Sequence, residues 1–110
     1  MNGYLKYFLT DYLKTMYEFT TDYYLLIAER LLESIGDKRY FSGVITLYDN
    51  DVELRLSCSL FVRYSQQHND EHPFRAVTHI TPVWWELNSR IGQSVIENDF
   101  SFGQMLNLMF

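Results

Sequence analysis

A strict alternation of apolar and polar side chains from Val52 to Tyr64 is the feature that most limits what this chain can form. Successive side chains of a β-strand point to opposite faces, so this pattern predicts a long strand with one buried and one exposed face. The predicted inward residues are Val52, Leu54, Leu56, Cys58, Leu60, Val62 and Tyr64, and the predicted outward residues are Glu53, Arg55, Ser57, Ser59, Phe61 and Arg63.

A second alternating run, from Tyr40 to Tyr48, precedes this strand and predicts a hairpin with it. A two-residue turn at Asp49-Asn50 matches the apolar faces of the two strands, whereas a three-residue turn would not. The better core face of the first strand holds Phe41, Ile45 and Leu47. The expected register pairs Leu47 with Val52, Ile45 with Leu54 and Phe41 with Cys58.

Residues 4–35 repeat apolar side chains every three or four positions instead. This spacing places them on one face and predicts a long amphipathic helix or a pair of helices. Thr20, Thr21 and Asp22 can each cap a new helix and mark the expected break, and Gly36 marks the expected C-terminal end. The predicted apolar face contains Leu5, Phe8 or Leu9, Tyr12, Met16, Phe19, Tyr23, Ile27, Leu31 and Ile35.

A third strand is predicted from Phe74 to about Trp85, and residues 88–99 are predicted to form a loop that holds at most a short strand at Ser94 to Glu97. Pro82 lacks a backbone donor, which predicts an edge strand or a bulge. The side chains of the adjacent residues Trp84 and Trp85 face opposite sides of the strand, and the pattern leaves open which of the two is exposed. The provisional inner set is Phe74, Ala76, Thr78, Ile80 and Trp84, and the outer set is Arg75, Val77, His79, Thr81 and Trp85.

The C-terminal segment carries a helix-start signal. Ser101 followed by Gln104 fits a capping box, and Phe100 and Met105 occupy the positions of a hydrophobic staple. We therefore expect a short helix from Phe102. Its buried side chains should be Met105, Leu106 and Met109.

These elements predict a single α+β domain over residues 1–110. An N-terminal long helix or helical pair packs on a 3–4-stranded antiparallel meander, followed by a short C-terminal helix. A chain of 110 residues with nineteen aromatic side chains can build a core without disulfides or a structural metal. The single cysteine, the lack of a signal-peptide pattern and an apolar run far shorter than the about 20 residues of a membrane span together predict a cytoplasmic protein.

One short motif points to metal chemistry. The letters His68-Asn69-Asp70-Glu71-His72 resemble the H-x-x-E-H pattern of inverted zincin metallopeptidases. That resemblance implies two zinc ligands, His68 and His72, with Glu71 as the base. The segment lies between two predicted strands, however, and Pro73 disfavours helical geometry at His72. A zinc hydrolase is therefore the third alternative for function, and we assign no metal.

The remaining motifs favour structural roles. Asp49-Asn50-Asp51 begins like a calcium loop but lacks its central glycine and distant glutamate, so we interpret it as a turn. Cys58 lies on the apolar face and is interpreted as an inert core thiol. The five glycines form no phosphate-binding or nucleophile-elbow motif. We therefore expect no enzyme activity and no cofactor.

The outer face of the predicted sheet is the candidate functional surface. It gathers cations and aromatic rings in a chain whose formal net charge is −5. If the loop after Tyr64 joins neighbouring strands symmetrically, Arg63 and Arg75 become cross-strand partners, which is unfavourable unless an anion or a carboxylate lies between them. The candidate binding residues are Tyr40, Arg55, Phe61, Arg63, Arg75, His79 and Trp85, with Val77 beside them.

Two classes of function suit this surface. The first is a small non-enzymatic domain that binds another protein or itself, because aromatic residues and arginine anchor protein interfaces. The second is an accessory single-stranded nucleic-acid binder, in which rings stack on bases and arginines neutralise phosphates. The net charge of −5 repels a polyanion and disfavours the second class. We therefore expect a protein partner or a homo-oligomer and no membrane association.

Overall fold

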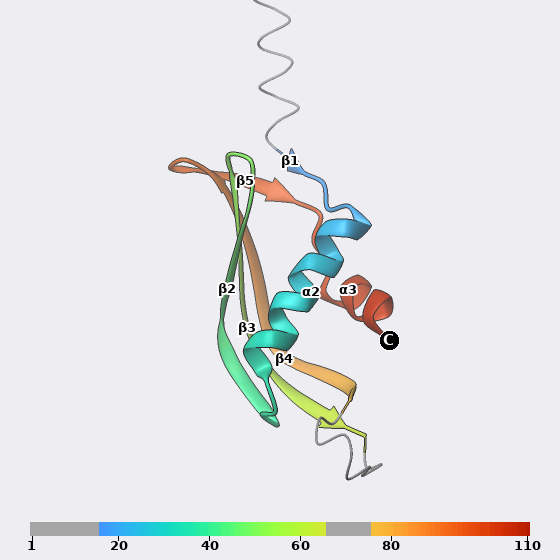
Figure 1. Ribbon diagram of the computed structural model, residues 1–110. Coiled ribbons are helices and arrows are strands. Elements are labelled where there is room, and N and C mark those ends of the chain that lie inside the picture. Colours follow the sequence, from blue (N-terminus) through green and yellow to red (C-terminus); the bar gives the residue numbers. More distant parts are fainter. Residues whose placement is uncertain (1–15, 66–75) are drawn as a thin grey trace, which may run out of the picture.

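The computed structural model describes residues 16–65 and 76–110 (Figure 1). Five strands form one sheet in the order β1-β5-β4-β3-β2, in which β1 runs parallel to β5 and the other neighbours are antiparallel. The elements are β1 (Met16–Tyr17), α2 (Thr21–Ile35), β2 (Tyr40–Asp49), β3 (Val52–Tyr64), β4 (Val77–Ile91), β5 (Ser94–Asn98) and α3 (Phe102–Met109).

Both helices pack on the same side of the sheet, and α2 also contacts α3 (Figure 1). Side chains from both helices and from the inward positions of β2, β3 and β4 form one core. The α+β class is therefore confirmed. The sheet itself is mixed and has five strands, in place of the predicted antiparallel meander of three or four.

Helix α2 begins and ends where the sequence predicted. The Thr20 side chain accepts a hydrogen bond from the Tyr23 N–H at 3.3 Å, and Gly36 ends the helix with φ 60°. A left-handed φ favours glycine because it has no Cβ. Neither α2 nor α3, the two helices of the described residues, is long and apolar enough to cross a membrane.

The prediction of a helix before Thr20 is wrong at Met16 and Tyr17, which form strand β1. Met16 and Tyr17 pair with Glu97 and Asn98 of β5, and this pairing outweighs the local helical spacing. The other positions of the predicted first helix, residues 4–15, lie outside the described residues. The Tyr17 hydroxyl also donates to Asp49 Oδ2 at 2.7 Å, which links β1 to the β2–β3 turn.

The β2–β3 hairpin turns one residue later than predicted. Asp49 pairs with Val52, so the two turn residues are Asn50 and Asp51. Asn50 has φ 53°, a left-handed conformation that asparagine tolerates better than most residues. The predicted cross-strand pairs are therefore wrong, but the faces are right because the register shifts by two residues. The observed pairs are Leu47 with Leu54, Ile45 with Leu56 and Phe41 with Leu60.

A bulge in β4 reverses the predicted faces of the two tryptophans. Ser59 pairs with Trp84 while Leu60 pairs with Pro82, which leaves Val83 as an extra residue. One extra residue moves every later side chain to the opposite face. Trp84 therefore points away from the helices and Trp85 points toward them, the reverse of the provisional assignment.

The start and the end of β4 also differ from prediction. A second irregularity between Arg63 and Tyr64 turns Val77 toward the core, whereas it was predicted to lie on the outer face. The strand continues to Ile91, so residues 88–91 are strand and not loop. The short strand predicted at Ser94 to Glu97 is confirmed as β5.

The C-terminal helix α3 starts at the predicted cap. The Ser101 hydroxyl accepts a hydrogen bond from the Gln104 N–H at 3.2 Å. The other half of the expected capping box is supplied from α2, because the Ser101 N–H donates to the Tyr24 hydroxyl at 3.1 Å. Phe100 and Met105 are both buried in the core, as a hydrophobic staple requires.

Candidate functional site

The candidate site is the face of the sheet that points away from both helices, which we call the open face. Figure 1 shows α2 and α3 on the other side of the sheet. Cross-strand pairing and exposure define its members. They are Tyr40, Ser42, Val44, Thr46 and Tyr48 on β2, Glu53, Arg55, Ser57, Ser59, Phe61 and Arg63 on β3, His79, Thr81, Trp84, Glu86, Asn88 and Arg90 on β4, and Val95 on β5.

Four of the predicted site residues meet at one end of the open face. Tyr40 and Phe61 are cross-strand partners, and their ring centroids lie 5.1 Å apart. Arg63 pairs with His79 on the next strand. This aromatic end therefore combines two exposed rings with an arginine and a histidine.

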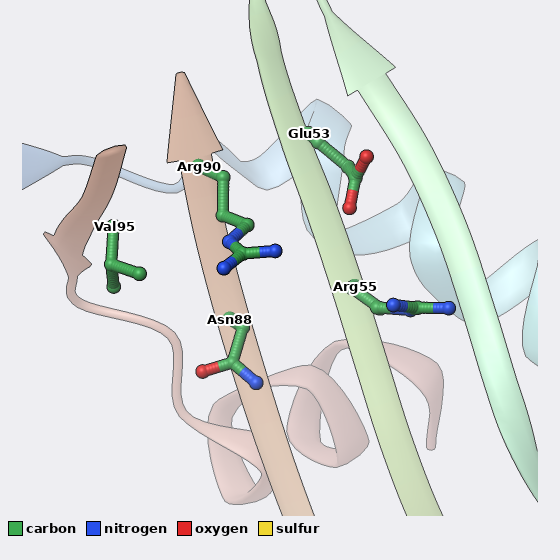
Figure 2. Close-up of a pocket in the computed structure, with 5 residues that line it drawn as sticks. All are labelled: Glu53, Arg55, Asn88, Arg90 and Val95. Atoms are coloured by element: carbon green, nitrogen blue, oxygen red, sulfur yellow. The ribbon is translucent and has the colours of Figure 1, made fainter. Parts of the chain in front are cut away.

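Arg55 lies in a different part of the open face, the charged end. It is six residues from Phe61 along β3, which corresponds to about 20 Å at the usual rise of a strand. There it lines a shallow pocket of about 250 Å³. Figure 2 shows the Arg90 side chain reaching from β4 toward β3, where Glu53 and Arg55 lie. The residues that line the pocket are Glu53, Arg55, Asn88, Arg90 and Val95.

The charges of the open face nearly cancel. Three arginines and two glutamates give a formal charge of +1, compared with −5 for the whole chain. Glu53 pairs with Arg90, and Glu86 lies on the same strand four residues before Arg90. Tyr48 donates a hydrogen bond to Glu53 Oε2 at 3.3 Å. The surface is therefore aromatic and mixed in charge, and it is not a cationic strip.

One predicted site residue, Trp85, does not join this face in the structure. Trp85 points toward the helices, where its ring lies 5.6 Å from that of Phe100 and 6.0 Å from that of Phe102. Arg75 lies outside the described residues. The expected cross-strand pair of Arg63 with Arg75 is wrong, because Arg63 pairs with His79.

The sequence interpretation missed several members of the open face because it ended the third strand too early. Residues 86–91 alternate in the same way as β3, with Leu87, Ser89 and Ile91 on the inner side. Read on its own, the alternation of residues 86–91 places Glu86, Asn88 and Arg90 outward, which is opposite to the parity predicted for Ile80 and Trp84. The bulge at Val83 accounts for this reversal, and it also turns Trp84 outward.

The sequence contains two candidate metal sites and one candidate nucleophile, and the structure describes only some of these residues. Asp49-Asn50-Asp51 forms the end of β2 and the hairpin turn, and among residues 16–65 and 76–110 no group of three or more acidic, histidine or cysteine side chains could hold a metal ion. The H-x-x-E-H letters, His68 to His72, lie outside the described residues. Cys58 is buried in the core, and burial raises the pKa of its thiol to about 11.

A tyrosine–aspartate cluster links β1 and α2 to the hairpin turn. Burial and the hydrogen bond to Asp49 raise the pKa of Tyr17. The interaction with Asp49 and partial burial also raise the pKa of Tyr23. The ring centroids of the two tyrosines lie 6.3 Å apart. Asp49 thus favours the protonated form of both hydroxyls.

We expect the free energy of unfolding to fall as the pH rises above about 8.5–10, the range in which unfolded cysteine and tyrosine lose their protons. The pKa values of Tyr17, Tyr23, Tyr64 and Cys58 are all raised in the folded protein. The unfolded chain then binds fewer protons in this range, so stability that is complete below it is lost as the pH increases. Thermal unfolding followed by circular dichroism from pH 8 to 11 measures this loss.

Two variants of the turn test the cause. Asp49→Asn removes the carboxylate that raises the pKa of Tyr17 and Tyr23 and should reduce the slope of Tm against pH. Asp51→Asn removes the same charge from the same turn, at an exposed position, and should leave the slope unchanged. A Tm that does not fall above pH 10, or equal slopes for both variants, would contradict the assignment.

A second concave region lies between α2 and α3, on the helical side of the protein. It has a volume of about 510 Å³ and is largely apolar. Its lining residues are Leu25, Ala28, Glu29, Leu32, Gly36, Val77, Leu108, Met109 and Phe110. Nothing among the described residues indicates what would fill this groove, and it serves below as a reference surface.

Comparisons of this chain with protein families, with curated proteins and with solved structures find no significant match. The function is therefore argued from the open face itself. Its aromatic end and its charged end are both exposed, and together they occupy three long adjacent strands. Such a surface suits contact with a large partner better than enclosure of a small molecule.

Proposed function

We propose that the protein is a non-enzymatic binding module that docks on a second protein through the open face of its sheet. The observation that carries this proposal is a set of six large apolar side chains that this face leaves exposed. Soluble proteins rarely expose large contiguous apolar patches without a function for them. The six side chains are Tyr40, Val44, Tyr48, Phe61, Trp84 and Val95, and they are between 49% and 66% exposed.

The composition of the face indicates the chemistry of the partner. Tyrosine, tryptophan and arginine are the residues that most often carry binding energy at protein interfaces. Glu53, Arg55 and Arg90 surround the pocket at the charged end, so a partner needs charges of both signs opposite them. The partner we propose is therefore a protein surface with an apolar centre and a rim of mixed charge.

A single-stranded nucleic acid is the second candidate, and the aromatic end favours it. Tyr40 and Phe61 could stack on bases while Arg63 contacts phosphate. Glu53 and Glu86 stand among the arginines of the same face, and they would repel a polyanion that extended along the strands. We therefore prefer a protein partner.

We expect that a photo-reactive phenylalanine analogue at Phe61, introduced in the cells that make this chain, cross-links to one protein. The same analogue at Trp84 should give the same adduct, because both positions lie on the open face. The matched control is the analogue at Leu25, which is also exposed but faces the groove between the helices. The adducts are measured by gel shift and identified by mass spectrometry.

Charge reversal at the other end of the face makes this test specific. Arg55→Glu, combined with the analogue at Phe61, should reduce the adduct, because it changes the charged end without touching the cross-linker. An adduct that forms equally from Leu25, or that survives charge reversal, would contradict the proposal. Saturable oligonucleotide binding at physiological salt that Arg63→Ala abolishes would favour the second candidate instead.

A further inference from the structure

Strand β2 is an edge of the sheet that no other described segment covers. It is the outermost strand, and Figure 1 shows it at the margin of the molecule, with no strand or helix of the described residues beyond it. It pairs with β3 without a bulge over all ten residues, contains no proline and carries one charge, Asp49, at its end. Proteins usually protect an edge with short length, lysine, proline or a bulge, because an open edge pairs with other strands.

The register shows which backbone groups of β2 are free. Asp49 and Val52 close the two-residue hairpin, and the Val62 N–H donates to the Arg39 carbonyl at 2.8 Å. Hydrogen-bonded positions alternate along an antiparallel pair, so odd-numbered residues from 39 to 49 bond to β3. The N–H and C=O groups that point to the free edge belong to Tyr40, Ser42, Val44, Thr46 and Tyr48.

These five residues form a chemically symmetrical series about Val44: tyrosine, hydroxyl, valine, hydroxyl, tyrosine. An antiparallel copy of β2 centred on Val44 is therefore complementary to it. Aromatic, hydroxyl and β-branched pairs opposite each other stabilise antiparallel sheets. The resulting pairs are Tyr40 with the partner's Tyr48, Ser42 with the partner's Thr46, and Val44 with the partner's Val44.

The other side of the strand and its ends fit the same register. On the core side, Phe41 lies opposite the partner's Leu47, so apolar side chains meet. At each end, Arg39 lies opposite the partner's Asp49, which places opposite charges together. A shift of the register by two residues in either direction would lose the tyrosine and hydroxyl pairs at once, so the chemistry specifies one alignment.

We propose that two copies of this chain pair through β2, antiparallel and about a two-fold axis at Val44. The two sheets then form one continuous sheet with five strands from each copy. Each of the five edge residues exchanges both its N–H and its C=O bond with the opposite strand. The open faces of the two copies join into one surface. This pairing concerns the strand edge and holds whatever binds the open face.

The oligomeric state of the full chain is the first test. Sedimentation across a range of concentrations should show a dimer for the natural sequence and a monomer for Val44→Pro. Proline removes the N–H at the two-fold axis but no bond to β3, because the Val44 groups point away from β3. Val44→Thr keeps both the N–H and the β-branch and should remain dimeric. Far-UV circular dichroism checks that each variant is folded.

Disulfide cross-linking tests the register. Opposed residues of a hydrogen-bonded pair have Cα atoms about 5.5 Å apart, which suits a disulfide. Val44→Cys should therefore form a covalent dimer when diamide oxidises the two thiols. Ser42→Cys should not, because position 42 of one copy lies opposite position 46 of the other copy, four residues from the second cysteine. Cys58 is buried and does not compete.

The outcomes separate this pairing from other arrangements. A natural chain that stays monomeric at every concentration overturns the proposal, as does equal cross-linking of Ser42→Cys and Val44→Cys. A dimer that survives Val44→Pro but is lost in Phe61→Arg means that two copies stack through their open faces. That result would overturn the edge pairing and would identify a second copy as the partner of the open face. If the photo-adduct is absent while the dimer is retained, the proposed function is contradicted and the edge pairing is not.

Discussion

Replacing Tyr24 with alanine is expected to lower the free energy of unfolding by about 3–5 kcal/mol, the usual loss for a large buried aromatic side chain. Tyr24 is 2% exposed, and its ring lies 5.3 Å from Phe19 and 5.5 Å from Phe100 between centroids. The truncation leaves a cavity where α2, the β1–α2 connection and the entry to α3 meet. Because domains are stable by only about 5–15 kcal/mol, this loss is a large share of the total.

The Tyr24→Phe variant keeps the ring and removes only the hydroxyl, so it measures the contribution of the hydroxyl to stability. The hydroxyl accepts a hydrogen bond from the Ser101 N–H at 3.1 Å and donates to the Asp99 carbonyl at 3.4 Å. Removing it leaves the Ser101 N–H without this partner, so we expect a smaller loss of about 1–3 kcal/mol. Urea unfolding followed by circular dichroism measures both variants. Phe110→Ala is the matched control, because Phe110 is exposed and its loss should cost about 0.5 kcal/mol or less. Equal losses for Tyr24→Ala and Tyr24→Phe would contradict this account.

The second large effect is the protection of the only thiol. We expect a thiol reagent to modify Cys58 at least about 10³-fold more slowly in the folded protein than in the unfolded chain, because the reaction requires the core to open. Cys58 is 1% exposed and lies between Gly43 of β2 and Trp85 of β4. Burial raises its thiol pKa from 9.0 to about 11, which alone reduces the reactive thiolate about 100-fold near neutral pH.

The absorbance change of Ellman's reagent, in buffer and in urea, measures this protection. Tyr24→Ala should accelerate the labelling of Cys58, because a less stable core opens more often. Phe110→Ala should leave the rate unchanged. Rapid labelling of the folded natural chain would show that β3 is accessible between its neighbours, which contradicts the buried position of Cys58.

The candidate site was predictable in part. The alternation along β3 correctly placed Arg55, Phe61 and Arg63 outward, because strand parity depends on nothing beyond the strand itself. The same reasoning provisionally set Trp85 outward and Trp84 inward without deciding which of them is exposed, and the bulge reverses the two faces. A strand that contains one extra residue places its even-numbered residues on one face before that residue and on the other face after it. The sequence signals this change through Pro82 and through the opposite parity of residues 86–91.

Local features of the fold were determined by the sequence alone. The cap at Thr20, the end of α2 at Gly36 and the cap at Ser101 depend on side chains within a few positions of the backbone groups they satisfy. The inward set of β3 likewise follows from its own alternation. These interactions are short in sequence, so the chain encodes them wherever it folds.

Only the tertiary structure decided the features that need a distant partner. Strand β1 exists because β5 pairs with Met16 and Tyr17, and the bulge at Val83 exists because β3 holds Ser59 and Leu60 beside β4. Neither pairing can be recognised from its own segment alone, because the energy of the pairing comes from hydrogen bonds between separate strands. The alternation from Val52 to Tyr64 thus determined one strand of the open face, and contacts across the sheet decided which aromatic and charged side chains of the other strands join it.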